Sequence, residues 1–513
     1  MTGLADKPDS AAASAPEKRD LLAIVLLMAA GLASFAWKLG ADGLWHDEAV
    51  SWRISRDWST MWAALLGHEA NMWLYYIGLH GWIRLFGESP AALRSLSVLA
   101  ALACIPLVYE TARRLLSRRA AVTAGVLLIT HVMMIRYAQE ARSYAWVALA
   151  GAGSTFLFGE MVFANRRRLW PLYAVVTAAG VWLHFHLVFL PMGHYLYLLG
   201  SNAWRTSWKT WLGAGLLIGA LLLPIPVLQP LDSGQVNYLV KPELDEVFRL
   251  LRLLSGGAPG NAVLAGTVLA LGLAAWFRYR ADRRAGTGGK GRPLLFLLAT
   301  FSAIPVVFLF SIFVKPLWTF NYFIFLVPAA CVLLAGLLDW LLPARRLFLA
   351  GAGLLVGLFV FVSVQNPLRR TESPLNRVVL HIARNAQAGD GVLVEKFWRN
   401  TPYFYAASRI PRMPPAARSK EGEPITYRWI ESATERQIAK LPGRHPRLWV
   451  VVWRKNSPAE WAVINRVLGR LEQVYRRTPP VNLGTARLLL LEAKGAGPVK
   501  AGPDNGSPSP GPS

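Results

Sequence analysis

The sequence predicts a mainly α-helical, polytopic membrane protein of about 11 transmembrane helices, with a small α/β domain at its C-terminal end. Its mean hydropathy is +0.34 and only 17% of its residues are charged, whereas soluble proteins carry about a quarter. Several runs of about 18 or more residues are almost uncharged, which is enough to cross a hydrocarbon core about 30 Å thick. Residues 366–495 differ, because short strand-like and helix-like stretches alternate there.

The apolar runs follow a regular order along the chain. They lie near residues 21–40, 90–111, 120–138, 143–163, 169–184, 186–201, 210–228, 261–277, 293–314, 320–342 and 346–364. Basic clusters such as Arg113–Arg119 and Arg166–Arg168 separate alternate pairs of these runs. Because such clusters stay in the cytoplasm, we expect the N-terminus inside and the chain after about residue 365 outside.

This topology accounts for much of the formal net charge of +25, so a nucleic-acid partner loses its main support. Both cysteines, Cys104 and Cys331, lie inside apolar runs, which excludes a disulfide framework and a CxxC metal site. Residues 1–20 are polar and rich in Ala, Ser and Pro, and residues 496–513 are rich in Gly, Pro and Ser. Both ends are therefore expected to be disordered.

The first outer loop, residues 41–89, is expected to lie on the membrane surface. Its segments DWSTMWAALLG (57–67) and HEANMWLYYIGLHGWIRLF (68–86) are helical in pattern and rich in aromatic residues, and the second also carries several polar groups. A crossing by residues 68–86 would push every later basic cluster outside. We therefore assign both helices to the outer interface, inside a transmembrane domain of residues 21–365.

Residues 366–495 are expected to form a small outer α/β domain. DGVLVE (390–395), RLWVVVWR (447–454) and ARLLLLEA (486–493) have the composition and length of strands. The stretches SPLNRVVLHIARNA and SPAEWAVINRVLGRLEQVYRR have helical spacing. No glycine-rich phosphate-binding motif follows any of these strands, so nothing indicates a bound nucleotide.

The predicted topology gathers ionisable and amide side chains on the outer face. The acidic pair of LWHDEAVSW (44–52) comes directly after the first span. The candidates for substrate contact or catalysis are His46, Asp47, Glu48, His68, Glu69, Asn71, Tyr137, Gln139, Glu140, Arg142, Tyr144, His184, His186, Lys315, Asn321 and Tyr322. Ionisable residues at the edge of a membrane are costly unless they have a function.

These groups could move a unit from a lipid phosphate to a hydroxyl. One carboxylate can deprotonate the hydroxyl, and a second can orient it or hold a metal. Cationic and amide groups can neutralise the phosphate that leaves. Each group also has a purely structural interpretation, since an Asp-Glu pair commonly caps a helix and histidines commonly pack at an interface.

The sequence resembles the bacterial membrane glycosyltransferases of the GT-C superfamily, which includes protein O-mannosyltransferases and the lipid A aminoarabinose transferase. LWHDEAVSW, HEANMWLYYIGLHGWIRLFGESPAALRSLS, YETARRLLSRRAA, RYAQEARSYAW and FNYFIFLVPAA carry the resemblance, in that order, over most of residues 20–365. Tyr75 and Arg94 lie within the second of these motifs and are further candidates for substrate binding.

The resemblance implies a polyprenyl-phosphate-linked sugar as donor, transfer with inversion on the periplasmic side, and a place in the bacterial inner membrane. It implies a general base at Asp47, with Glu48 orienting the acceptor or Asp47 itself. Glu69 is expected at metal or substrate, and Glu140 and Arg142 near the donor sugar and phosphate. The acceptor hydroxyl could belong to a lipid, a glycan or a protein.

Two departures concern the substrates. Many relatives read Arg-Tyr where this chain has Asn321-Tyr322, so Lys315 or Arg142 would have to meet the phosphate. Prolines of the relatives are replaced by Asn71, Met72 and Trp73, which is expected to reshape the acceptor entrance.

Two alternatives and the question of a metal ion stay open at this point. A transporter or flippase of a lipid-linked glycan would use a similar set of spans, but its ionisable residues usually lie near the bilayer midplane. A catalytically silent relative would use its outer domain to bind a partner. Metal dependence is also open, because Glu69 with His184 or His186 could hold a divalent metal ion but no ligand spacing demands one.

Overall fold

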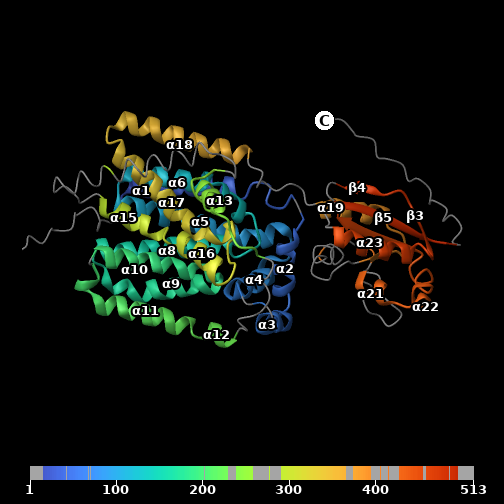
Figure 1. Ribbon diagram of the computed structural model, residues 1–513. Helices are drawn as coiled ribbons and strands as arrows, with labels where there is room; N and C mark the ends of the chain where they lie inside the picture. The colour runs from blue at the N-terminus through green and yellow to red at the C-terminus, as the bar shows by residue number, and fades with distance from the viewer. Residues whose placement is uncertain are drawn as a thin grey trace, which may run out of the picture. The chain divides into compact units, whose positions relative to one another are not determined.

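The computed structural model describes residues 16–41, 43–67, 69, 71–201, 203–228, 239–257, 277, 291–365, 374–393, 405, 414, 427–453, 458–483 and 486–494 (Figure 1). The chain forms two compact units. One comprises Met1–Ala41 and Ser51–Thr371, and the other comprises Asp42–Val50 and Glu372–Ser513. The predicted disordered ends lie almost entirely outside the described residues, and the predicted domain limits stay predictions.

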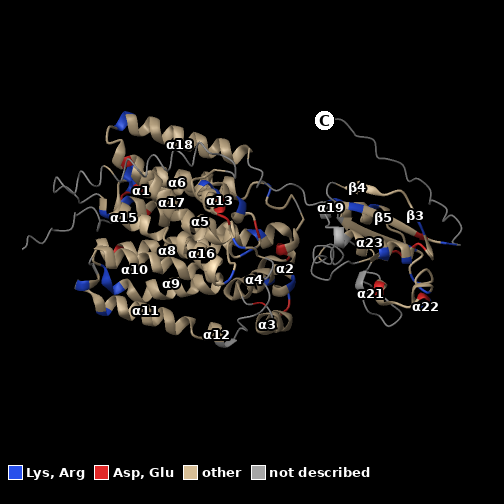
Figure 2. Ribbon diagram, viewed as in Figure 1, with Lys and Arg blue, Asp and Glu red and all other residues tan. Residues whose placement is uncertain are grey.

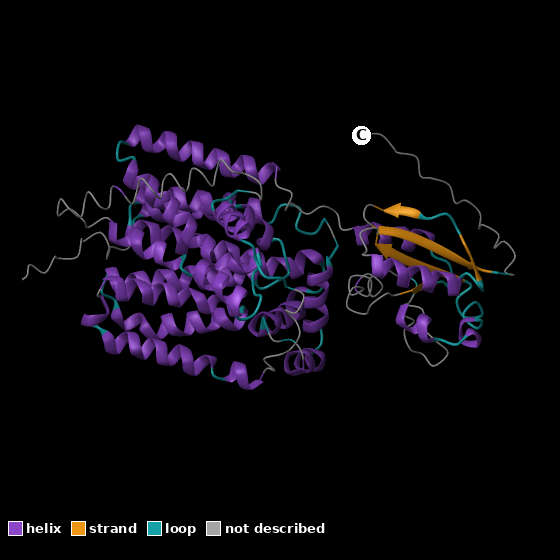
Figure 3. Cartoon of the chain, viewed as in Figure 1, coloured by secondary structure: helices purple, strands orange, loops and turns teal. Residues whose placement is uncertain are grey.

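The first unit is helical (Figure 3). Its helices are α1 (Lys18–Phe35), the second half of α2 (His46–Ser55), α3 (Trp58–Gly67), α4 (Trp73–Phe86), α5 (Pro90–Leu115), α6 (Arg118–Thr130), α7 (Val132–Ala138), α8 (Tyr144–Phe163), α9 (Trp170–Leu183), α10 (Phe189–Ser201), α11 (Trp208–Leu222), α12 (Pro224–Leu228), α13 (Leu244–Leu254), α15 (Gly291–Thr300), α16 (Ala303–Phe313), α17 (Val327–Leu341) and α18 (Arg345–Gln365). Short 3-10 turns are η2 (Arg167–Leu169), η3 (Phe185–Val188), η4 (Ala203–Thr206) and η5 (Phe320–Leu326).

The predicted apolar runs fall on these helices, apart from 261–277, of which only Phe277 is described. Within the described part, six helices are long and apolar enough to span a membrane, or seven if α6 and α7, bent by 55°, count as one. The helices α9 and α10 are shorter, with 14 and 13 residues. The helix α1 begins with three charged residues, which shortens its apolar part. The count of about 11 spans therefore stays a prediction.

Charged residues of this unit gather near the ends of helices and in the connecting segments (Figure 2). At the start of α1, the buried Asp20 carboxylate accepts hydrogen bonds from Arg118 Nε at 2.8 Å and from Tyr109 Oη at 2.9 Å. These contacts tie the start of α1 to the end of α5 and the start of α6. The three ends therefore share one face, as alternate crossing of a membrane requires.

Two further ion pairs join other helices to the same face. Arg114, in the last turn of α5, contacts Glu110 at 2.8 Å and Glu160 near the end of α8 at 3.0 Å. Arg119, in the first turn of α6, contacts Asp339 near the end of α17. The basic residues used to predict the topology thus also hold the helix ends together by charge-assisted hydrogen bonds.

Small residues let the helices approach closely. A Cβ added to Gly151 of α8 would lie 2.7 Å from the carbonyl oxygen of Phe325 in η5. A Cβ added to Gly193 of α10 would clash with the carbonyl of Ala299 and would lie 2.9 Å from Cα of Thr300, at the end of α15. These two contacts depend on the absence of a side chain.

The outer loop contains three helices rather than the two expected. α3 and α4 confirm the helices predicted within 57–67 and 68–86, although α4 begins only at Trp73 and His68 lies outside the described residues. Tryptophan rings link them, with centroids 6.1 Å apart between Trp62 and Trp73 and 5.6 Å between Trp73 and Trp182 of α9. α2 is the additional helix, and its first turn carries the acidic pair.

The second unit is built on a five-stranded sheet. Its strands are β1 (Gly391–Leu393), β2 (Arg447–Trp453), β3 (Tyr475–Arg477), β4 (Val481–Leu483) and β5 (Ala486–Ala493). β1 pairs parallel to β2, and β5 pairs antiparallel with β2, β3 and β4. The three predicted strands are confirmed. Residues 475–477 were expected at the end of a helix, and that expectation is wrong because they pair with β5.

Helices cover both faces of this sheet (Figure 1). They are α19 (Pro374–Asn385), α21 (Tyr427–Ser432), α22 (Glu435–Ile438) and α23 (Pro458–Leu471). Leu448 and Val450 of β2 pack with residues of α21, α22 and α23, whereas Trp449 packs with residues of α19. This alternation along β2 follows from the two-residue repeat of a strand, so the unit has three layers and two small cores.

We expect Gly193→Ala to destabilise the helical unit by about 1–3 kcal/mol, because the new methyl group has to displace backbone atoms of α15. Gly200→Ala is the matched control on the same helix, since nothing lies within 4 Å of its added Cβ. Thermal unfolding in detergent should show a lower Tm for the first variant only. An unchanged Tm for Gly193→Ala would mean that α10 and α15 pack less closely than described.

We expect Asp20→Asn to lower stability by about 1–3 kcal/mol, because a buried carboxylate that accepts charged hydrogen bonds is replaced by a neutral amide. Glu17→Gln is the control, since the Glu17 side chain is 67% exposed and its ion pair with Arg118 is screened by water. The same unfolding measurement should rank Asp20→Asn well below Glu17→Gln. Equal melting temperatures would contradict the structural role of Asp20.

Candidate active site

The acidic pair Asp47-Glu48 lies in the first turn of α2, where carboxylates interact favourably with the helix dipole. Glu48 is fully buried, and its Oε2 accepts a hydrogen bond from the backbone N–H of Trp45 at 3.2 Å. This contact to the residue three positions earlier resembles half of a capping box. Asp47 and His46 are only half-buried. The two neighbouring carboxylates therefore differ, with Glu48 engaged in holding the helix start and Asp47 more accessible.

A second group of polar residues belongs to the helical unit and begins with the loop between α7 and α8. Glu140 is almost completely buried, and its carboxylate lies 3.4 Å from the Arg136 guanidinium. The hydroxyl of Ser97 in α5 donates to the carbonyl of Glu140 at 2.6 Å and to that of Arg142 at 3.2 Å. This loop is therefore fixed to α5 by one buried serine.

Tyr144, the first residue of α8, links this loop to η5. Its hydroxyl accepts a hydrogen bond from Asn321 Nδ2 at 2.6 Å. The Arg142 guanidinium lies 5.9 Å from the centre of the Tyr144 ring, and the centres of the Tyr137 and Tyr144 rings lie 4.9 Å apart. Three other predicted site residues thus meet around Tyr144.

The turn His184–His186 adds imidazoles to the same cluster. The Tyr322 ring lies 4.3 Å from the His184 ring and 4.6 Å from the His186 ring, centre to centre. His186 Nε2 lies 2.9 Å from the carbonyl oxygen of Leu317, and Asn71 Oδ1 accepts from the backbone N–H of Phe185 at 3.3 Å. The loop of residues 41–89, the histidine turn and η5 are therefore in contact.

Burial keeps both histidines neutral. It lowers the pKa of His186 to about 4. It also lowers the pKa of His184 well below its ordinary value, and the positive charge of Arg142 adds to this effect. A neutral imidazole can pack against an aromatic ring and form one directed hydrogen bond.

Other predicted site residues hold the scaffold together. Gln139 Nε2 donates to the carbonyl of Ser34 in the last turn of α1 and to that of Trp37 just after it, and the buried Arg94 donates to the carbonyl of Leu39 at 2.7 Å. Both side chains thus brace the segment that leads from α1 towards α2.

The remaining candidates lie in the outer loop or between spans. Glu69 Oε1 accepts from Tyr76 Oη at 3.2 Å, and the backbone carbonyl of Glu69 accepts from Trp73 Nε1 at 3.1 Å. Tyr75 is buried, and Lys315 is half-buried in the segment between α16 and η5. Among the described residues, no three His, Cys, Asp or Glu side chains come together as metal ligands.

The sequence patterns did not single out Ser97, although it is the second serine of the motif Arg94-Ser95-Leu96-Ser97. Its role becomes visible only when α5 is placed beside the loop at 139–143, because its partners are backbone carbonyls 43 and 45 residues away.

Comparison with known proteins identifies the fold. Residues 60–229 match the family described as dolichyl-phosphate-mannose-protein mannosyltransferase. The structure of ArnT from Cupriavidus metallidurans bound to undecaprenyl phosphate is similar over 94% of this chain and 99% of that one, with a TM-score of 0.59 and 15% identity. The chain has the GT-C fold of membrane glycosyltransferases. It is a multi-pass membrane protein, and the predicted resemblance is confirmed.

The apo structure of the same ArnT agrees, with a TM-score of 0.56 and 15% identity over 92% of this chain and 98% of that one. No curated protein matches the sequence. Within this GT-C chain, the family match contains the loop at 139–144 and the histidine turn, but it includes neither Asp47-Glu48 nor Asn321-Tyr322.

We expect the buried neutral histidines to make this protein sensitive to acid. Because the folded pKa of His186 is about 4 and the unfolded value is about 6.5, the unfolded chain binds more protons as pH falls through this window, and stability decreases. In His186→Gln the amide can still donate to the carbonyl of Leu317. Its Tm should fall less steeply than that of the wild type between pH 6.5 and 4, while the Tm difference between the two proteins should stay constant above pH 7. Parallel curves in the acidic window would contradict this assignment.

Proposed function

We propose that this protein is a glycosyltransferase that moves a sugar from a polyprenyl-phosphate donor to a hydroxyl group on the periplasmic face of the bacterial inner membrane. The observation that carries the proposal is the cluster of Glu140, Arg142, Tyr144, Asn321 and Tyr322 in a GT-C fold. Polar residues of several loops meet there. A solved structure of similar fold, ArnT, holds undecaprenyl phosphate.

The reaction needs one base and one cation. Asp47 removes the proton of the acceptor hydroxyl while the oxygen attacks the anomeric carbon from the face opposite the phosphate, which inverts that centre. A new carbon–oxygen bond forms, the bond from the anomeric carbon to the phosphate oxygen breaks, and its electron pair leaves with the polyprenyl phosphate. The proton remains on Asp47 and is later released to water.

The accessibility of Asp47 supports its role as the base. Glu48 is buried and bonded to the backbone of Trp45, so its role is to orient the first turn of α2. Asp47, being half-buried, is the member of the pair that an acceptor can reach more readily.

Arg142 is the cation proposed for the phosphate. Its backbone is fixed through Ser97 and Glu140, and its guanidinium lies beside the Tyr144 ring. A preorganised cation of this kind stabilises charge that develops on a leaving group. Asn321, which stands where many relatives have arginine, holds the Tyr144 hydroxyl. Lys315 is the second cation available to the phosphate.

The proposed topology has about 11 spans, with the N-terminus in the cytoplasm and the α/β unit in the periplasm. The acceptor is a lipid, a glycan or a protein, and the sugar is a hexose or a pentose. Flipping of a lipid-linked glycan is the competing activity, and the experiment below separates the two.

We expect Asp47→Asn to lower the transfer rate by about 10²–10⁴-fold, because the amide cannot accept the hydroxyl proton. The measurement is mass spectrometry of glycolipids and glycans from cells that lack the gene and are complemented with the wild type or the variant. The matched control is Asp57→Asn, an exposed carboxylate of the same outer loop whose capping contact to Thr60 an asparagine preserves.

The wild type and Asp57→Asn should restore a defined hexose or pentose in the glycan profile. Asp47→Asn should not restore it, although this variant is present in the membrane in the same amount. Restoration by Asp47→Asn would overturn the base assignment. A glycan profile that does not change when the gene is lost would contradict transfer and favour the non-enzyme alternatives.

A further inference from the structure

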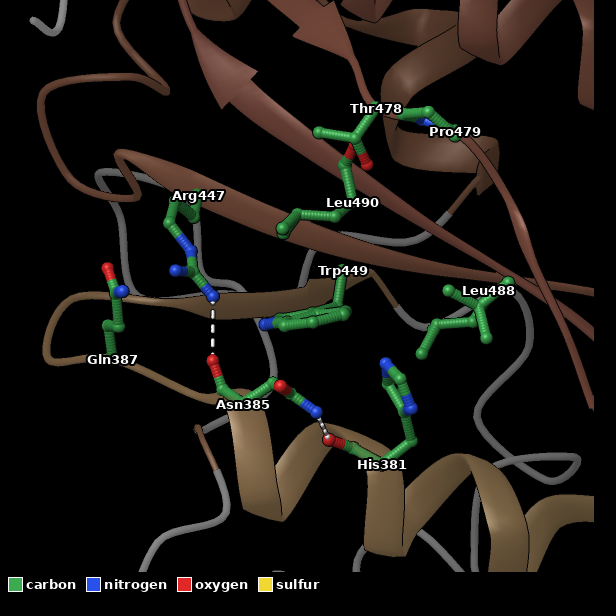
Figure 4. A pocket seen from close by; sticks show the side chains of 10 residues that line it. His381, Asn385, Gln387, Arg447, Trp449, Thr478, Pro479, Leu488 and Leu490 are labelled. Atoms are coloured by element: carbon green, nitrogen blue, oxygen red, sulfur yellow. Dashed lines mark hydrogen bonds between the residues drawn. The ribbon is translucent and has the colours of Figure 1, made fainter. Parts of the chain in front are cut away.

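The C-terminal unit contains a pocket that the proposed chemistry does not use. It lies between α19 and the sheet and has a volume of about 300 Å³. Figure 4 shows its side chains, with His381 and Asn385 on α19 and Trp449 on the facing strand β2. Arg447 and Gln387 stand at one end of the pocket, and Thr478 contributes a further polar group.

A buried ion pair holds one end of this pocket in place. The Asp390 carboxylate lies 3.1 Å from Arg447 Nε and accepts from Trp449 Nε1 at 2.8 Å and from the backbone N–H of Gln387 at 3.0 Å. Arg447 Nη2 also donates to the carbonyl of Asn385 at 2.8 Å. Asp390 is only 2% exposed, so the geometry of Arg447 and Trp449 is set before any ligand arrives.

The same ion pair removes net charge from the pocket. The positive charge of Arg447 is compensated by Asp390, so the pocket has little attraction left for a phosphate or a carboxylate. Its lining is otherwise neutral. This charge balance argues against an anion-binding site and for an uncharged ligand.

Hydrogen-bonding groups nevertheless remain available around the pocket. Within the described part of the chain, neither ring nitrogen of His381 has a hydrogen-bond partner, and the side-chain amide of Gln387 has none. The Asn385 Nδ2 donates to the carbonyl of His381 at 2.8 Å, and its Oδ1 has no partner among the described residues. These groups supply both donors and acceptors.

The other side of the pocket is apolar. Trp449 and Leu488 are buried beneath it, and Leu490 and Val481 contribute aliphatic surface. An apolar floor with polar groups around it suits a compact ring with hydroxyls on its edge and C–H bonds on its face. A pyranose has this distribution, whereas an acyl chain would leave the polar groups without partners.

We propose that this pocket binds one neutral sugar residue of a glycan. The binding requires no catalytic step and does not depend on the role of Asp47. If the proposed transfer uses a glycan acceptor, the pocket supplies an anchoring point for it.

The test uses the full chain in phosphatidylcholine nanodiscs, because maltoside detergents themselves carry sugars. The probes are the methyl glycosides of mannose, glucose, galactose and N-acetylglucosamine, and saturation-transfer NMR measures their binding. We expect at least one to bind, and expect His381→Ala and Gln387→Ala to raise its Kd by about threefold to tenfold, the effect of one lost hydrogen bond. Gln473→Ala is the matched control, an exposed glutamine of the same unit that does not line the pocket.

Gln473→Ala should bind like the wild type, and inorganic phosphate should not compete with the glycoside. Absence of binding by all four glycosides, unchanged binding in both pocket variants, or displacement by phosphate would each overturn the proposal. Gln387 is exposed, so its variant keeps the test valid even if His381→Ala unfolds. Asp47→Asn should lose transfer and keep glycoside binding, which separates this inference from the proposed function.

Discussion

The absence of water from the hydrocarbon core of a bilayer is the constraint on which the helical unit depends. Backbone groups there have to form hydrogen bonds within helices, and ionisable groups have to lie near helix ends or find partners. The chain satisfies both conditions. Arg114, Arg118 and Arg119 each meet a carboxylate from another helix at one set of ends, where they fix how the helices align.

The same constraint explains why the candidate site is built from loops and short turns. Residues 139–143, the histidine turn and η5 interrupt the regular helices, and their exposed backbone groups need partners. The Ser97 hydroxyl donates to two of the carbonyls, and Asn71 Oδ1 accepts from the N–H of Phe185. Polar side chains are therefore brought together, around Tyr144, by the need to satisfy the backbone.

Sequence patterns predicted those helices and strands that correspond to long hydrophobic runs. The apolar runs identify the helices, and the strand-like runs identify β1, β2 and β5. α2 was missed because its ten residues have no clear apolar face. β3 and β4 were missed because three-residue strands carry almost no pattern of their own and form only by pairing with β5. Arg94 and Gln139 stay predictions as substrate contacts, and no sequence pattern indicated that their side chains donate to carbonyls at the end of α1 and in the segment after it.

The sequence by itself determined the membrane class, the presence of an α/β unit and the set of polar residues from which a site could be built, because hydrophobic runs and residue types are local properties. Only the tertiary structure decided what each of these residues contacts. It distinguished Glu48, buried against the backbone of Trp45, from the more accessible Asp47. It also joined Tyr144 to Asn321 and neutralised Arg447 with Asp390. The last two contacts join groups 177 and 57 residues apart, which packing brings together and which no local pattern encodes.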